Sequence, residues 1–408
     1  MTSQELAHAR RRLEAFTTDV LGVVGRSERR HWGEVYVRGL LLDGQRKSIQ
    51  PMAERLPDGD EQAMQQFVNQ SPWSSVDVRR RVAERVVAAM QGPAAWILDE
   101  TGFPKQGRHS VGVARQYSGT LGKIGNCQVA VSLHYAMADA AMPMNWALYL
   151  PEEWAKDKDR RQSAHVPAGE PFRTKWELGL VLMDEALTWG VPAQPVVADA
   201  GYGKIAEFRA GLEQRRLQYV VGVDAATTVW RGQVPGGVPE SGPRGRPRTR
   251  WQYHGSPESV LDVANALQAG AWHCLTWRAG SKGPLSSRFA ALRVRTAHRQ
   301  ADGDPPGPEQ WLLIEWPESE PEPVHYFLSN LPPDTTLHAL VSLAMIRWMI
   351  EQDYSQLKDE LGLDHYEGRG WPGWHHHVTL VSLAYGFLVL ERLRAKKNFW
   401  VDPSAGAP

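Results

Sequence analysis

The sequence predicts an α/β fold built on a mixed sheet, with a helical N-terminal domain before the sheet and a β-rich insertion within it. The apolar run Ala95–Leu98 leads directly into Asp99 and Glu100, which is typical of a buried strand that delivers carboxylates to its end. The same pattern returns where Val196–Ala198 precedes Asp199. Strand-like and helix-like segments alternate between these acids, whereas the first 90 residues carry only helical patterns.

The composition bounds the class of protein. A chain of 408 residues with 42% hydrophobic residues exceeds one average domain, and we expect two or three domains with their own cores. The two cysteines, Cys127 and Cys274, are far apart in sequence, which argues against a disulfide framework or a cysteine zinc site and fits a reducing cytoplasm. The polar N-terminus and the shortness of the apolar runs predict a cytoplasmic protein that does not contact a membrane.

Positive charge is concentrated in patches. The formal net charge is zero, so a polyanion would have to be held by local basic groups and not by an overall field. One patch lies on the helix expected from about Ser75 to Met90, where four arginines spread over a broad polar face: Arg79, Arg80, Arg81 and Arg85. Two interpretations of this face stay open, a solvated basic surface and a helix that contacts DNA phosphates.

The strands after residue 93 are expected to be antiparallel in chain order, as a meander. The glycine-rich segment GTLGKIGN between two of them lacks the Lys-Ser/Thr ending of a phosphate loop, so it predicts a hairpin loop and gives no indication of a nucleotide cofactor. A helix, the strand before Asp199, a second helix and a further strand follow.

A Pro/Gly/Arg-rich stretch at residues 234–250 interrupts this order, and strand-like segments then resume up to about residue 333. This pattern predicts a β-rich insertion whose basic loop, with Arg244–Arg250, either touches a polyanion or is a solvated linker.

The C-terminal segment predicts one continuous helix from Leu337 to about Leu361 and a last helix from about His376 to Lys396. On a helical wheel, Arg347, Glu351 and Lys358 share one face beside an apolar stripe. If this helix is considered alone, a salt bridge between residues i and i+4 explains the spacing of Arg347 and Glu351 as well as a functional role does.

Three segments, ILDETGFPKQG, VVADAGYG and IRWMIEQDYSQLKDELGL, together resemble the DDE transposases of bacterial insertion sequences, in the seven-hundred-and-one branch of superfamily four. In that superfamily the third acid lies after a β-rich insertion, in the helical motif Y-x-x-R-x-x-x-E-x-x-x-x-x-x-K. Arg347, Glu351 and Lys358 stand at the R, E and K positions. Ala344 stands where the motif has tyrosine, which leaves open the hydrogen bond that the tyrosine would supply.

The resemblance implies a ribonuclease H-like catalytic domain and a division of the chain into four parts. These are a helical DNA-binding region at 1–92, the first part of the catalytic domain at 93–224, the β-rich insertion at 225–333 and the C-terminal catalytic helices at 334–408. It further implies that Asp99, Asp199 and Glu351 are catalytic and hold two Mg²⁺ ions, which Mn²⁺ can replace. The residues expected to bind DNA are Arg347, Lys358, Arg79, Arg80, Arg81 and Arg85.

The implied activity is that of a DNA transposase, an enzyme that cuts transposon ends by phosphodiester hydrolysis and joins the released 3′-hydroxyl to target DNA by transesterification. The expected partners are double-stranded DNA, as inverted-repeat ends and target, and a second copy of the chain in a homodimer assembled on DNA. Two alternatives stay open: a metal-dependent DNA nuclease without strand transfer, and a transposase-derived, non-catalytic DNA-binding regulator. The regulator is disfavoured because all three acids are present.

Overall fold

The computed structural model describes residues 3–92, 94–241, 247–280, 283–297 and 303–401. The chain forms two compact units, Met1–Ala193 with Trp348–Pro408, and Gln194–Arg347. These units divide the chain at other positions than the predicted boundaries at residues 92, 224 and 333. The first three residues of the basic loop expected at Arg244–Arg250, residues 244–246, lie outside the described residues.

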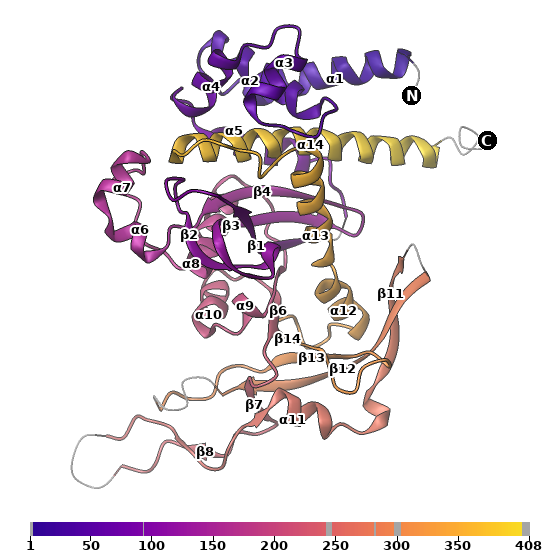
Figure 1. Cartoon of the computed structure of the whole chain (residues 1–408). Coiled ribbons are helices and arrows are strands. Elements are labelled where there is room, and N and C mark those ends of the chain that lie inside the picture. The colour runs from indigo at the N-terminus through magenta and orange to yellow at the C-terminus, as the bar shows by residue number, and fades with distance from the viewer. Residues whose placement is uncertain (1–2, 93, 242–246, 281–282, 298–302, 402–408) are drawn as a thin grey trace. The chain divides into compact units, whose positions relative to one another are not determined.

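The N-terminal helices of the first unit pack on its C-terminal helix. Side-chain caps begin two of them: Asp60 accepts from the N–H of Ala63 at 2.9 Å, and Ser74 accepts from that of Asp77 at 3.1 Å. Helices α1, α2, α4 and α5 all contact α14 (Figure 1), so residues 1–92 share a core with the end of the chain. The bounds are α1 Ser3–Leu21, α2 Ser27–Leu41, α3 Ile49–Arg55, α4 Glu61–Asn69, α5 Ser75–Val87 and α14 Trp371–Val401.

Two histidines of α14 lie inside this core. Adjacent residues at the start of a helix point in different directions, so the sequence alone predicts a solvated helix entrance for the run His375–His377 and no metal site. The ring nitrogens of His376 lie 2.7 Å and 2.9 Å from the carbonyl oxygens of Val68 and Trp73, and His377 Nδ1 lies 2.9 Å from the hydroxyl of Tyr36. Burial lowers the pKa of His377 to about 4. The prediction of a solvated entrance is wrong because the N-terminal helices cover the start of α14.

The strands of the first unit are β1 Ala94–Pro104, β2 Ala114–Ser118, β3 Lys123–Met137 and β4 Ala140–Leu148. Strand β3 pairs antiparallel with each of the other three, so the predicted meander is wrong: β2 pairs with β3 and not with β1. Helix α8, Lys175–Thr188, begins with a capping box and contacts β3 and β4. A Cβ on Gly179 of α8 would lie 2.5 Å from the side chain of Leu98, so the missing side chain lets α8 approach β1 closely.

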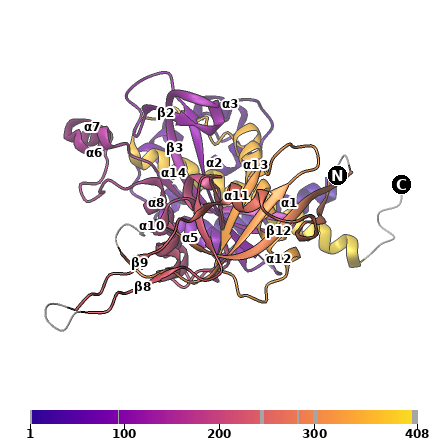
Figure 2. The same ribbon diagram turned by 90° about the horizontal axis from the view of Figure 1, so that it is seen from below.

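The second unit is a mixed sheet with helices, and most of it is the expected β-rich insertion. Its strand order is β10-β7-β12-β13-β14-β6-β5, with β11 on β12; β5 and β6 are parallel and the other described pairs antiparallel. A separate ribbon of β8 and β9 extends from it (Figure 2). The bounds of its elements are β5 Val196–Ala198, α9 Ala200–Gly203, α10 Ala206–Gln214, β6 Tyr219–Val223, β7 Thr228–Arg231, β8 Gly236–Gly237, β9 Gln252–Tyr253, β10 Glu258–Ser259, α11 Val260–Asn265, β11 His273–Gly280, β12 Gly283–Thr296, β13 Gln310–Trp316 and β14 His325–Ser329.

The continuous helix predicted from Leu337 to Leu361 is broken. Helix α12, Leu337–Met345, ends in the second unit, and α13, Trp348–Ser355, begins in the first, with a turn at residues 346–347 between them. A π-helical turn, Gln356–Glu360, follows α13. Because a π-helix bonds residue i to i+5, Lys358 is rotated away from the position that a regular wheel gives it.

The other helices of the first unit are α6 Glu152–Lys156 and α7 Lys158–Ser163. None of the helices in the described ranges is both long and apolar enough to cross a membrane.

Candidate active site

Asp99 lies in the middle of β1, on the face of the sheet that helix α13 covers, so the prediction that it ends its strand is wrong: pairing with β3 continues through Pro104. Its side chain is 9% exposed, and its Oδ1 accepts from the N–H of Glu100 at 2.7 Å. Ser132 of β3 lies directly opposite Asp99 in the antiparallel ladder, so the two side chains share a face. Glu100 points to the other face, where Lys175 Nζ lies 2.7 Å from its carboxylate.

Helix α13, which carries Glu351, contacts β1. Tyr354, on α13, forms a hydrogen bond of 2.7 Å between its hydroxyl and Ser132 Oγ. Burial, and after it the nearby negative charge of Asp99, raise the pKa of Tyr354 well above its ordinary value, so this hydroxyl stays protonated. Glu351 is exposed and lies three residues before Tyr354, hence on the same side of the helix. The first unit therefore brings the helix of Glu351 to the strand of Asp99.

A chain of buried hydrogen bonds continues beneath this contact. His134 Nε2 lies 3.0 Å from Ser132 Oγ, and His134 Nδ1 lies 2.9 Å from Asp353 Oδ2. Tyr385 of α14 donates to the other oxygen of Asp353 at 2.8 Å. Ser132 and His134 are on β3 and Asp353 is on α13. These hydrogen bonds therefore attach the helix of Glu351 to the sheet at a second point, in addition to the Tyr354–Ser132 bond.

Sequence reasoning missed these side chains. Ser132 and His134 stand two residues apart in the otherwise apolar run Val129–Ala136, which places them on one face. Two polar groups on one face of a fully buried strand require polar partners, and this requirement is the signal that could have found them.

Asp199 is held by the backbone around it. It follows the three-residue strand β5 and is the N-cap of α9, where its Oδ1 accepts from the N–H groups of Gly201 at 2.9 Å and Tyr202 at 3.4 Å. A Cβ on Gly222 of β6 would lie 2.8 Å from Ala200 N, so a glycine is needed where β6 passes this turn.

The family follows from a match over most of the chain. The model of the family described as DDE superfamily endonuclease matches residues 19–284, more than half of the chain. The chain belongs to the DDE superfamily endonucleases. The matched span of this endonuclease contains Asp99 and Asp199, and Glu351 lies beyond it.

The endonuclease is also similar to a protein described as the probable transposase for insertion sequence element IS701 of Microchaete diplosiphon. The two are 29% identical over 187 residues, which is 45% of this chain and 46% of the relative, so the chain spans less than half of that relative's length. Among solved structures it is similar to the piggyBac transposase in a synaptic complex with hairpin DNA. That match has a TM-score of 0.42 and 12% identity, and it covers 92% of this chain and 68% of the other.

The predicted metal ligands of the endonuclease are distributed over both units, with Asp99 and Glu351 in the first and Asp199 in the second. Within the described ranges, no three His, Cys, Asp or Glu side chains gather into a metal-binding group, so the triad stays a prediction. The donors themselves fit a hard cation, because each predicted ligand offers carboxylate oxygens. Asp99 and Asp199 each commit one oxygen to backbone N–H groups, which fixes the direction of the carboxylate.

Lys358 is attached to the strand that carries Asp99. Its Nζ donates to the carbonyl of Gly102 and to Thr120 Oγ1, each at 3.0 Å, and lies 5.8 Å from the ring centre of Phe103. Burial lowers the pKa of Lys358. The half-buried lysine therefore fastens the π-helical turn to the end of β1, which is a structural task in addition to the DNA contact predicted for it. Arg347, the other cation of the motif, belongs to the second unit.

The four arginines of α5 do not all lie on the polar face that the sequence predicts for them. Arg79 is 3% exposed, and burial lowers the pKa of its guanidinium to about 10, so the prediction that it lies on the polar face is wrong. The other three form ion pairs with Asp19 and Glu84. The distances are 2.9 Å for Arg80–Glu84, 2.5 Å and 3.1 Å for Arg81 with Asp19 and Glu84, and 2.9 Å for Arg85–Asp19. These pairs agree with the solvated interpretation, and DNA binding by α5 stays a prediction.

Proposed function

We propose that this endonuclease is a DNA transposase that cuts double-stranded DNA at the ends of a mobile element and joins the released 3′-hydroxyl to target DNA. Membership of the DDE superfamily and the similarity to an insertion-sequence transposase support the class of reaction. The observation that carries the proposal is the Tyr354–Ser132 hydrogen bond, because it holds the helix of Glu351 against the strand of Asp99.

In this proposal Asp99, Asp199 and Glu351 hold two Mg²⁺ ions, which would activate the attacking oxygen and stabilise the leaving oxygen. Asp99 is fixed on its strand and oriented by the N–H of Glu100. Asp199 is oriented by the N–H groups at the start of α9, which leaves its second oxygen as a donor. Tyr354 stays neutral beside Asp99 because of its raised pKa, so it adds no negative charge to the site. Arg347 and Lys358 would hold phosphates on either side of the reacting bond.

The finer structural assignment belongs to the same proposal. Antiparallel strands β1, β3 and β4, followed along the chain by the parallel pair β5 and β6, support a ribonuclease H-like catalytic domain that is completed by α13 and interrupted by the insertion. We propose that two copies assemble on DNA in the cytoplasm and that no nucleotide cofactor takes part.

The test is a joining assay with the full chain, Mg²⁺, labelled DNA from the flanks of its gene and a supercoiled target plasmid. The proposal predicts that labelled ends become covalently attached to the plasmid, and that Asp99→Asn protein neither cuts nor joins. Nicking without joining would support a nuclease without strand transfer. Binding of end DNA with no cutting at any Mg²⁺ or Mn²⁺ concentration would support a non-catalytic regulator.

A further inference from the structure

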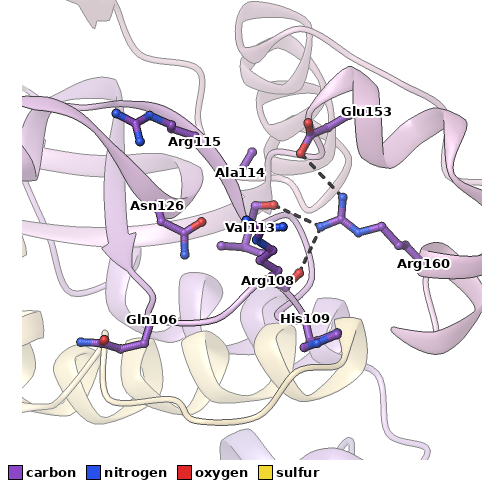
Figure 3. A pocket seen from close by; sticks show the side chains of 9 residues that line it. All are labelled: Gln106, Arg108, His109, Val113, Ala114, Arg115, Asn126, Glu153 and Arg160. Atoms are coloured by element: carbon purple, nitrogen blue, oxygen red, sulfur yellow. Dashed lines mark hydrogen bonds and ion pairs between the residues drawn. The ribbon is translucent and has the colours of Figure 1, made fainter.

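A basic pocket lies in the first unit beyond the end of the strand that carries Asp99. Its volume is about 630 Å³, and it is lined by the segment between β1 and β2, by β2 and β3, and by α6 and α7 (Figure 3). The pocket begins at Gln106, two residues after β1 ends. At about 3.3 Å per extended residue, it lies about 20 Å from Asp99 along the chain.

Side chains from other elements hold the wall of this pocket in place. Asn126 of β3 donates to the carbonyls of Lys105 and Gly107 at 2.7 Å and 2.9 Å. Trp154 of α6 donates to the carbonyl of Val113 at 2.7 Å. Because these bonds connect the β1–β2 segment to separate elements, the segment is a fixed wall of the pocket.

Arg160 of α7 is part of the same framework. Its Nη2 donates to the carbonyl of Arg108 at 3.1 Å, and its guanidinium lies 3.9 Å from the ring centre of Trp154. Glu153, the acid that lines the pocket, lies 3.6 Å from Arg160 and offsets its charge.

Two charges in the pocket are left for a ligand. Arg108 and Arg115 both line the pocket and are exposed, and neither side chain has an ion-pair or hydrogen-bond partner in the part of the chain that the structure describes. His109 adds a further nitrogen to the lining. Guanidinium groups match the oxygens of a phosphate with two parallel N–H donors, so an anionic phosphate is the ligand that fits these groups best.

The surface next to the pocket favours a large ligand over a free ion. Tyr117 and Ile124 lie opposite each other on β2 and β3 and are 59% and 58% exposed. Arg115 stands two residues before Tyr117, on the same face of β2. An aromatic ring and an aliphatic side chain beside arginine can contact sugars and bases, which an inorganic phosphate does not have.

We propose that this pocket binds the phosphodiester backbone of the double-stranded DNA that the Asp99 site acts on. The proposal rests on the proposed function and adds a DNA contact to it. A distance of about 20 Å corresponds to about six base pairs, so the pocket would hold DNA roughly half a helical turn from the bond that is cut. A phosphate held at that distance from the Asp99 site determines which phosphodiester bond of the DNA lies at that site.

The experiment uses the full chain and compares wild type with Arg108→Ala, Arg115→Ala and the double variant. Lys158→Ala is the matched control, because Lys158 is an exposed cation on the helix of Arg160 that does not line the pocket. The dissociation constant for end DNA is measured between 50 and 300 mM salt. Ethylation interference identifies the phosphates whose modification weakens binding. Thermal unfolding checks that each variant is folded. We expect all of them to fold, because the substituted arginines are exposed and have no structural partners in the described part of the chain.

We expect the double variant to bind end DNA about tenfold more weakly at 0.15 M salt and to lower the slope of log K against log salt by roughly 2. Interference should disappear at phosphates about six base pairs from the cleavage site, and Lys158→Ala should keep it. An unchanged slope and an unchanged interference pattern in the double variant would refute the pocket as a DNA site.

Titrations with inorganic phosphate and with ATP separate a DNA site from a small-anion site. Micromolar binding of either that is lost in the double variant, with unchanged DNA affinity, would overturn the proposal. The two proposals also fail separately. A wild type that binds end DNA with the expected interference but never cuts it refutes the transposase and keeps the pocket, whereas a double variant that cuts and binds like wild type refutes only the pocket.

Discussion

Asp99 and Asp199 end the same kind of sequence pattern, yet the protein holds the two carboxylates in different ways. Asp99 lies within an eleven-residue strand, beside a tyrosine from α13 that bonds to Ser132 on the neighbouring strand. Asp199 follows a three-residue strand and is held by the N–H groups of Gly201 and Tyr202. The first setting depends on contacts between distant segments and the second on local backbone geometry, so they should be sensitive to different substitutions.

The largest effect is expected when either carboxylate is removed. Asp99→Ala and Asp199→Ala should each lower Mg²⁺-dependent cleavage of end DNA at least about a thousandfold, because each would remove a metal ligand worth several kcal/mol in the transition state. DNA binding should be retained, since both groups repel phosphate. Cleavage and binding measured on the same preparations check this, and an Asp99→Ala protein that still cuts would rule out the predicted triad.

Gly222→Ala should damage the Asp199 setting alone. The new Cβ would lie 2.8 Å from Ala200 N and 3.1 Å from the carbonyl carbon of Asp199, so the turn must move. A displacement near 1 Å is enough to lower cleavage by about a hundredfold. Gly237→Ala is the control, because a Cβ there meets nothing within 4 Å. Equal cleavage by the two variants would show that β6 does not position Asp199.

The long-range contacts of the first unit should make it sensitive to acid. The folded pKa of His377 is about 4, below its ordinary value of 6.5, so its contribution is complete above pH 6.5 and is lost as the pH falls from 6.5 towards 4. The shift corresponds to about 3 kcal/mol. Urea unfolding at pH 7.5, 6, 5 and 4 should show a shallower pH dependence for His377→Gln than for wild type. Parallel curves would contradict this assignment.

Tyr354→Phe is expected to have a smaller effect, confined to the Asp99 setting. Loss of the hydroxyl removes one hydrogen bond worth about 1 kcal/mol and loosens α13 against β3. Cleavage should fall about fivefold to tenfold, with a higher Mg²⁺ concentration at half-maximal rate, because the Glu351 helix is held less firmly. Tyr149→Phe, at a half-buried tyrosine of the same unit that does not line the basic pocket, is the control. A Tyr354→Phe protein with wild-type Mg²⁺ dependence would show that the bond is only structural.

Both acidic strands could be predicted from sequence because an apolar run followed by an acid is a local signal. The central position of β3 could not, since pairing between distant strands leaves no trace in either strand alone. Arg79 was open to prediction: it lies three and seven residues before Val82 and Val86, so a wheel centred on these valines places it on their buried face.

The break between α12 and α13 could not be predicted from the sequence, because the segment contains no proline or glycine and its apolar pattern continues through Ile346. The site showed the same limit. Its candidate acids, which stay a prediction, could be named individually, whereas the Ser132–His134–Asp353 contacts depend on how a strand and a helix meet.

The central claim is that Glu351 is the third acid, and its closest competitors are on the same segment. Asp359 accepts from Ser355 Oγ at 2.7 Å, and Glu360 is exposed on the π-helical turn. Of these three acids, Glu351 is the one that lies one turn before Tyr354, whose hydroxyl bonds to Ser132 opposite Asp99. Arg347→Ala and Lys358→Ala are expected to have intermediate effects, because they would weaken the positioning of DNA without removing a metal ligand.

The most direct measurement is Mg²⁺-dependent nicking of end DNA by Glu351→Gln, Asp359→Asn and Glu360→Gln proteins of equal thermal stability. Each change replaces a carboxylate with an amide of the same shape, so differences between the variants report the role of the charge. The structure and the family resemblance predict that Glu351→Gln abolishes nicking while the other two keep most of it. Nicking retained by Glu351→Gln and lost in Glu360→Gln would contradict the assignment of the third acid.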